Sequence, residues 1–99
     1  MLEIIKKRCG IAKEVTAYNE EIELYMEDCK LDMLASGVPE SIIRKEREDV
    51  VTAVTLYVKA YIGNDRTDTD DYLKLYGKKV FRLSLEEEDV EQEHIAAKE

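Results

Sequence analysis

The chain has 99 residues, which is enough for one domain with a single modest core. Its formal net charge of −8 has the wrong sign for a protein whose main activity is to bind nucleic-acid phosphates. One proline and four glycines favour helices over a β-sandwich, and no apolar segment is long enough to cross a membrane.

The first predicted helix runs from Leu2 to Cys9, and Gly10 can supply the left-handed residue that ends it. Its last turn is basic, which suits the negative end of the helix dipole, and contains Lys6, Lys7 and Arg8. Residues 11–18 have no sustained period and are predicted to be a connection.

The second predicted helix runs from Glu20 to Ala35, with Thr16 or Asn19 as its cap. Pro39 follows the end of this helix and can open the next one at its first position. The apolar residues of the second helix recur at the helical period and form its predicted core stripe, which consists of Ile22, Tyr25, Met26, Cys29, Leu31, Met33 and Leu34.

Residues 50–62 are apolar nearly all the way round, which is typical of a helix surrounded by other helices. The charged run before them leaves two alternatives open: one long helix over 40–62, or a short helix followed by the buried one. The sequence therefore predicts an all-α fold, a small bundle of about four helices around a central helix at about 50–62.

A polar turn over 63–69 precedes the last predicted helix, which Asp68 or Thr69 can cap. Residues 79–85 alternate after Phe81, so a short strand is an alternative there, but no second strand candidate is available to pair with it. We expect a helical domain over 1–85 and an acidic, flexible tail over 86–99. The core stripe of the last helix contains Tyr72, Leu73, Tyr76, Val80 and Leu83.

The sequence offers no recognisable catalytic constellation. His94 is the single histidine and lies in the acidic tail, where nothing would fix it as a base. The aspartates at 65–71 lack the spacing of an EF-hand, and Cys9 and Cys29 are too few for a structural zinc site. We expect two reduced, packed cysteines, no cofactor, no metal site and no enzymatic activity.

Charge is segregated along the chain, and this pattern suggests a contact surface. A solvated surface can produce such segregation by chance. The alternative is a head-to-tail contact in which the basic face of one subunit meets the acidic face of its neighbour and closes a ring. Under that reading the contact residues are Lys6, Lys7, Arg8, Glu20, Glu23, Glu27, Arg44, Lys45 and Arg47.

Four segments, 9–11, 21–32, 54–63 and 71–76, together resemble the small head-tail connector proteins of long-tailed bacteriophages and prophages, in order and spacing over roughly 9 to 85. These are also called head completion or adaptor proteins. The resemblance implies a non-enzymatic ring beneath the portal, matched to it as a dodecamer in the virion and built from a subunit that is a weakly associating monomer in solution. The ring would extend the DNA channel and bind the portal protein and a stopper or tail-completion protein after DNA packaging.

A second hypothesis is a small acidic helical regulator, or a DNA-mimicking inhibitor, that binds one protein partner.

The resemblance places the protein at the head-tail interface of the virion, with DNA only as passing cargo and no membrane partner. Because residues 1–4 lack the pattern of a signal peptide, we expect synthesis in the cytoplasm of the bacterial host.

Overall fold

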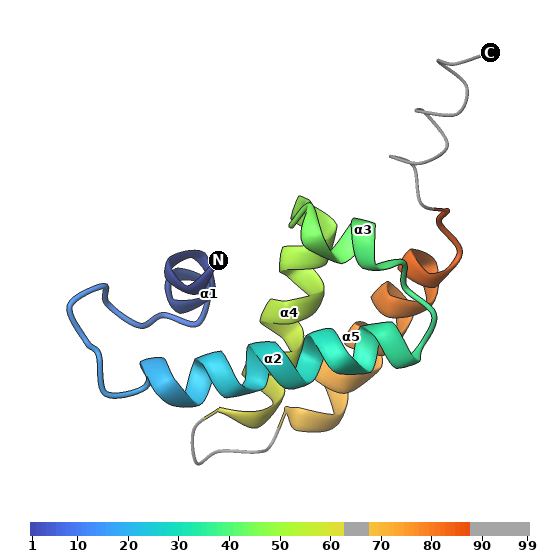
Figure 1. Ribbon diagram of the computed structural model, residues 1–99. Coiled ribbons are helices and arrows are strands. Elements are labelled where there is room, and N and C mark those ends of the chain that lie inside the picture. The colour runs from blue at the N-terminus through green and yellow to red at the C-terminus, as the bar shows by residue number, and fades with distance from the viewer. Residues whose placement is uncertain (63–67, 88–99) are drawn as a thin grey trace.

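The computed structural model describes residues 1–62 and 68–87, and its regular elements within those ranges are all α-helices (Figure 1). The predicted all-α bundle is confirmed, and the short strand considered for 79–85 is wrong, because those residues lie at the end of the last helix. The five helices are α1 (Leu2–Arg8), α2 (Asn19–Ala35), α3 (Glu40–Arg44), α4 (Glu48–Tyr61) and α5 (Thr69–Ser84).

Helix α4 is the centre of the domain, as the apolar run over 50–62 predicts. Its principal neighbours are α5 and α2, and it also packs against α1 (Figure 1). Thr55 is buried in α4 without a polar penalty, because its hydroxyl donates to the carbonyl of Val51 at 2.8 Å. Half of the residues of the helix are buried: Val50, Val51, Ala53, Val54, Thr55, Val58 and Ala60.

The helical conformation is interrupted between α3 and α4. Of the two alternatives that the sequence leaves open for residues 40–62, the structure has the short helix followed by the buried one. Glu46 has a φ of 50°, in the left-handed region, and Arg47 is extended with φ −60° and ψ 163°. Neither conformation continues an α-helix, so a short α3 precedes the buried α4. Pro39, predicted at the first helical position, is instead the N-cap residue of α3.

Helix α2 buries one stripe and exposes the other side. Ile22, Cys29 and Met33 are buried as predicted. Leu31 and Leu34 are exposed, which corrects their predicted place in the core stripe: α4, the principal neighbour of α2, covers only one side of it. The predicted cap is also wrong, because Tyr18 occupies the N-cap position and makes no side-chain cap bond.

Helix α5 begins where the sequence predicts, with Asp68 at the N-cap position. The Thr69 hydroxyl donates to the Ala60 carbonyl at 3.0 Å and so joins the start of α5 to the last turn of α4. Tyr76, Val80 and Leu83 are buried as expected. Residues 63–67 of the predicted turn over 63–69, and most of the predicted tail, from residue 88, lie outside the described residues.

Tyrosine rings connect α2, α4 and α5 at one end of the core. The ring of Tyr57 lies 4.9 Å from that of Tyr61 and 5.1 Å from that of Tyr76, centroid to centroid, and Tyr25 stacks on Tyr61 at 5.8 Å. The Tyr76 hydroxyl donates to Asp32 Oδ2 at 2.6 Å. The cluster therefore combines aromatic packing with a polar tie between α5 and α2.

Cys29 lies beside this cluster, with its Sγ 3.7 Å from the Tyr76 hydroxyl, and burial raises the pKa of its thiol to about 12. Burial also raises the pKa of the half-buried Cys9 thiol.

Because only the thiolate is alkylated, we expect iodoacetamide at pH 8 to modify Cys9 slowly and Cys29 only after unfolding, with both rates rising with pH. Mass spectrometry of native and urea-unfolded protein measures this; equal labelling of Cys29 in the two states would contradict it.

Candidate assembly surface

The basic residues of α1 do not share one environment. Lys6 is buried, and its Nζ donates to the backbone carbonyls of Lys13 at 3.1 Å and Val15 at 2.5 Å. Lys7 is exposed, and Arg8 donates to the hydroxyl of Thr52 on α4 at 3.2 Å. Lys6 thus holds the connection between α1 and α2, and any part it takes in a subunit contact stays a prediction.

The basic residues around α3 are also divided between surface and intramolecular roles. Arg44 is exposed and pairs with Glu40 one turn earlier at 3.3 Å, a geometry worth only a few tenths of a kcal/mol. Arg47 pairs with Asp49 at 2.9 Å and with Glu86 at 2.5 Å, and these carboxylates raise the pKa of its guanidinium. Lys45 is exposed at the end of α3.

The pair between Arg47 and Glu86 joins the start of α4 to the residues after α5. Asp49 Oδ1 also accepts from the backbone N–H of Val50, so the carboxylate is fixed from two sides. Glu86 is the first residue of the predicted tail, and this contact ties it to the helical domain. The boundary proposed at residue 85 remains a prediction.

The acidic residues predicted for the contact are all exposed on α2. Glu20, Glu23 and Glu27 recur at a spacing of three and four residues, which places them on one side of the helix, opposite the buried stripe. Asp28 lies beside them and is also exposed. The structure therefore gathers these carboxylates on a single solvent-facing side, whereas it separates the basic residues into the α1 and α3 groups.

A second charged side, on α5, was missed by sequence reasoning. Lys74, Lys78 and Arg82 are exposed, and Phe81 and Leu85 lie exposed among them. The spacing of 74, 78, 81 and 85 was the available signal, because it alternates steps of four and three residues along one side of a helix. The sequence analysis considers only the opposite side of this helix, which carries its core stripe.

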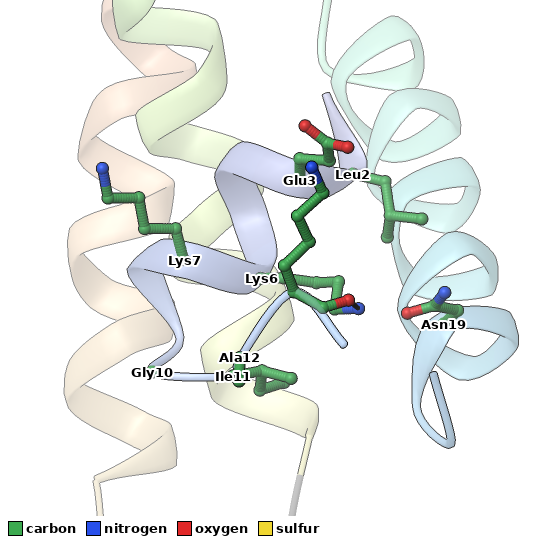
Figure 2. A pocket seen from close by; sticks show the side chains of 9 residues that line it. Leu2, Glu3, Lys6, Lys7, Gly10, Ile11, Ala12 and Asn19 are labelled. Atoms are coloured by element: carbon green, nitrogen blue, oxygen red, sulfur yellow. Dashed lines mark hydrogen bonds between the residues drawn. The ribbon is translucent and has the colours of Figure 1, made fainter. Parts of the chain in front are cut away.

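A hollow of about 610 Å³ lies against α1 and is bounded by the connection and the start of α2 (Figure 2). Figure 2 shows Glu3, Lys6 and Lys7 on α1, with Asn19 across the hollow at the start of α2. Asn19 Oδ1 is buried and has no hydrogen-bond partner among the described residues. The residues that line the hollow include neither a histidine nor a cysteine.

Within residues 1–62 and 68–87, no group of three or more histidine, cysteine, aspartate or glutamate side chains is arranged to hold a metal ion. In the same described ranges, no helix is both long and apolar enough to span a bilayer. The features that stand out are surface features: a helical domain that presents acidic and basic sides separately. This combination defines the class of the fold, a small all-helical module with segregated surface charge.

Comparison with known proteins identifies the kind of module. Residues 1–90 match the sequence profile of the phage connector protein family, so this chain belongs to that family and is a phage head-tail connector protein. The match confirms the resemblance carried by the segments between 9 and 85. No curated protein and no solved structure gave a significant match.

Membership of the family gives the protein a structural connecting role in the phage particle, in contact with other head or tail proteins of the virion. It also favours a protein without catalytic activity.

Proposed function

We propose that this protein is a ring subunit of the phage neck, which assembles beneath the portal and extends the DNA channel toward the stopper or tail. The observation that carries the proposal is the family match over residues 1–90, together with the all-helical fold of the residues that the structure describes. The segregation of charge onto separate sides of the domain supports it, because complementary sides on one subunit allow head-to-tail contacts that close into a ring.

The acidic character of the chain supports the proposed relation to DNA. A ring of subunits that each carry a net charge of −8 would repel a duplex at its centre rather than hold it. The duplex would then pass as cargo without being bound.

The proposal is tested by mixing the protein with the assembled portal of the same phage and measuring the mass of the complex by native mass spectrometry. The expected result is a portal complex that carries one connector subunit per portal subunit. A protein that ignores the portal but forms a one-to-one complex with a different host or phage protein would instead support the regulator hypothesis. Binding of duplex DNA alone in preference to the portal would also contradict the proposal.

Reversing the charge at Arg44 is expected to weaken binding of the subunit to the portal by about tenfold at low salt. Arg44 is exposed and its only described partner is the exposed Glu40, so Arg44→Glu should leave the stability of the monomer nearly unchanged. Titration of the portal followed by mass measurement gives the effect. Lys13→Glu is the matched control, since Lys13 is an exposed cation outside the predicted contact; an equal effect of both variants would remove Arg44 from the contact.

A further inference from the structure

Two helices of the domain present outward sides that are both apolar and charged. The outer face of α2, as we use the term, consists of Glu20, Leu24, Glu27, Asp28 and Leu31. The outer face of α5 consists of Lys74, Lys78, Phe81, Arg82 and Leu85.

The apolar residues of these faces are unusually exposed. Leu24 and Leu31 are 63% and 58% exposed, and Phe81 and Leu85 are 64% and 68% exposed. Single exposed apolar residues are common on protein surfaces, but here they are aligned along the helix in both cases. Leu24 and Leu31 are seven residues apart, and Phe81 and Leu85 are four apart, so each pair forms part of one row.

The charges around these rows have opposite sign. The α2 face carries three carboxylates, and the half-buried Lys30 lies only at its edge. The α5 face carries three cations, and none of them pairs with a carboxylate among the residues that the structure describes. The acidic residues of α5, Asp70 and Asp71, lie in its first turn, one turn before this face begins. Each face therefore lacks the counter-charges that the other supplies.

The two faces cannot satisfy one another within one molecule. Both α2 and α5 pack against α4 (Figure 1). Their outer residues remain exposed in the folded monomer. Pairing of α2 faces with each other, or of α5 faces with each other, would bring like charges together, which costs free energy. The partner that fits is the opposite face of a second copy of this chain.

We propose that the outer face of α2 docks on the outer face of α5 of the neighbouring subunit, in a head-to-tail contact. Leu24 and Leu31 would be covered by Phe81 and Leu85, with the acidic and basic residues paired around them. Such a contact is heterologous, so it propagates from subunit to subunit and can close a ring. This inference rests on the proposed ring and names the surfaces that build it; it uses Glu20 and Glu27 but places the basic partner on α5 rather than on α1 or α3.

Two single variants test the contact, because each removes one face and leaves the other. Leu31→Asp disrupts the α2 face and Phe81→Asp disrupts the α5 face, at positions that are exposed in the monomer. Circular dichroism and a urea midpoint verify that both fold. Ile4→Asp is the matched control, since Ile4 is 48% exposed on α1 and belongs to neither face.

Sedimentation equilibrium from micromolar to millimolar concentration gives the result. We expect the parent protein and the control to self-associate beyond a dimer, and each face variant alone to be monomeric. An equimolar mixture of the two variants should form a heterodimer and grow no further, because each retains one complementary face. Retained self-association of either variant alone, a monomeric mixture, or a parent that stays monomeric throughout would overturn the contact.

A charge exchange is a second, gentler test. Glu27→Lys and Lys78→Glu are each expected to weaken self-association about tenfold at low salt, and the double variant should recover most of the loss. No recovery would contradict the pairing of these two faces. If the folded face variants still bind the portal as isolated monomers, the α2–α5 contact is wrong as a requirement for assembly but the proposed function stands. If the parent protein itself does not bind the portal, the proposed function is refuted.

Discussion

Replacing Val54 with aspartate is expected to abolish cooperative folding of the domain. Val54 lies in the middle of α4 and is completely buried between α5 and α2. A carboxylate there would have no charged partner, and burial of an unpaired charge costs several kcal/mol at least. Since a small domain has a total stability of about 5–15 kcal/mol, most of that margin would be lost. Far-UV circular dichroism and urea titration measure the change.

Val15→Asp is the matched control for this substitution. Val15 has the same side chain but lies exposed in the connection between α1 and α2, so its replacement should change the free energy of unfolding by less than about 0.5 kcal/mol. If the Val54 variant kept the helix content and urea midpoint of the control, α4 would not be the core of the folded protein.

Replacing Lys6 with methionine is expected to cost about 2–3 kcal/mol, the range for losing hydrogen bonds from a charged donor. Methionine retains the apolar packing of the buried stem but leaves the carbonyls of Lys13 and Val15 without their donor. The connection between α1 and α2 should then open more readily, and limited proteolysis should cut it faster. Urea titration measures the loss of stability.

Lys7→Met is the control for the loss of a cation from α1, because Lys7 is exposed. Its expected effect on the free energy of unfolding is below about 0.5 kcal/mol. Equal effects of the two substitutions would show that the Lys6 ammonium contributes nothing beyond its charge, and would contradict its role in holding the connection.

Much of the fold follows from the periodicity of the apolar residues. Val50, Val54 and Val58 recur every four residues and predict the buried α4, and Ile22, Cys29 and Met33 predict the inner stripe of α2. The break before α4 was not decided by the sequence, because it depends on the left-handed conformation of Glu46, which is uncommon for a residue other than glycine. Leu31 was misplaced because an apolar residue beside a core stripe has the same local pattern whether or not a neighbour covers it.

The candidate surface was less predictable than the fold. Charge alone does not distinguish Lys6, whose ammonium binds two carbonyls of the same chain, from the exposed Lys7 beside it. Arg47 is engaged by Asp49 and by Glu86, and the second of these contacts depends on how α5 returns to the start of α4. The basic side of α5 was predictable in principle, because the sequence already places Tyr76, Val80 and Leu83 in the core stripe, and Lys74, Lys78 and Arg82 recur on the exposed side of the same helix.

Electron cryomicroscopy of purified virions, with particles lacking this protein as the comparison, tests its proposed place in the neck most directly. We expect a ring of helical density between the portal and the tail or stopper that accommodates α4 enclosed by α2 and α5, with α2 of each subunit against α5 of the next. The same density should be missing from particles without the protein. A neck that is identical in both kinds of particle would contradict the proposal that this chain forms the connecting ring.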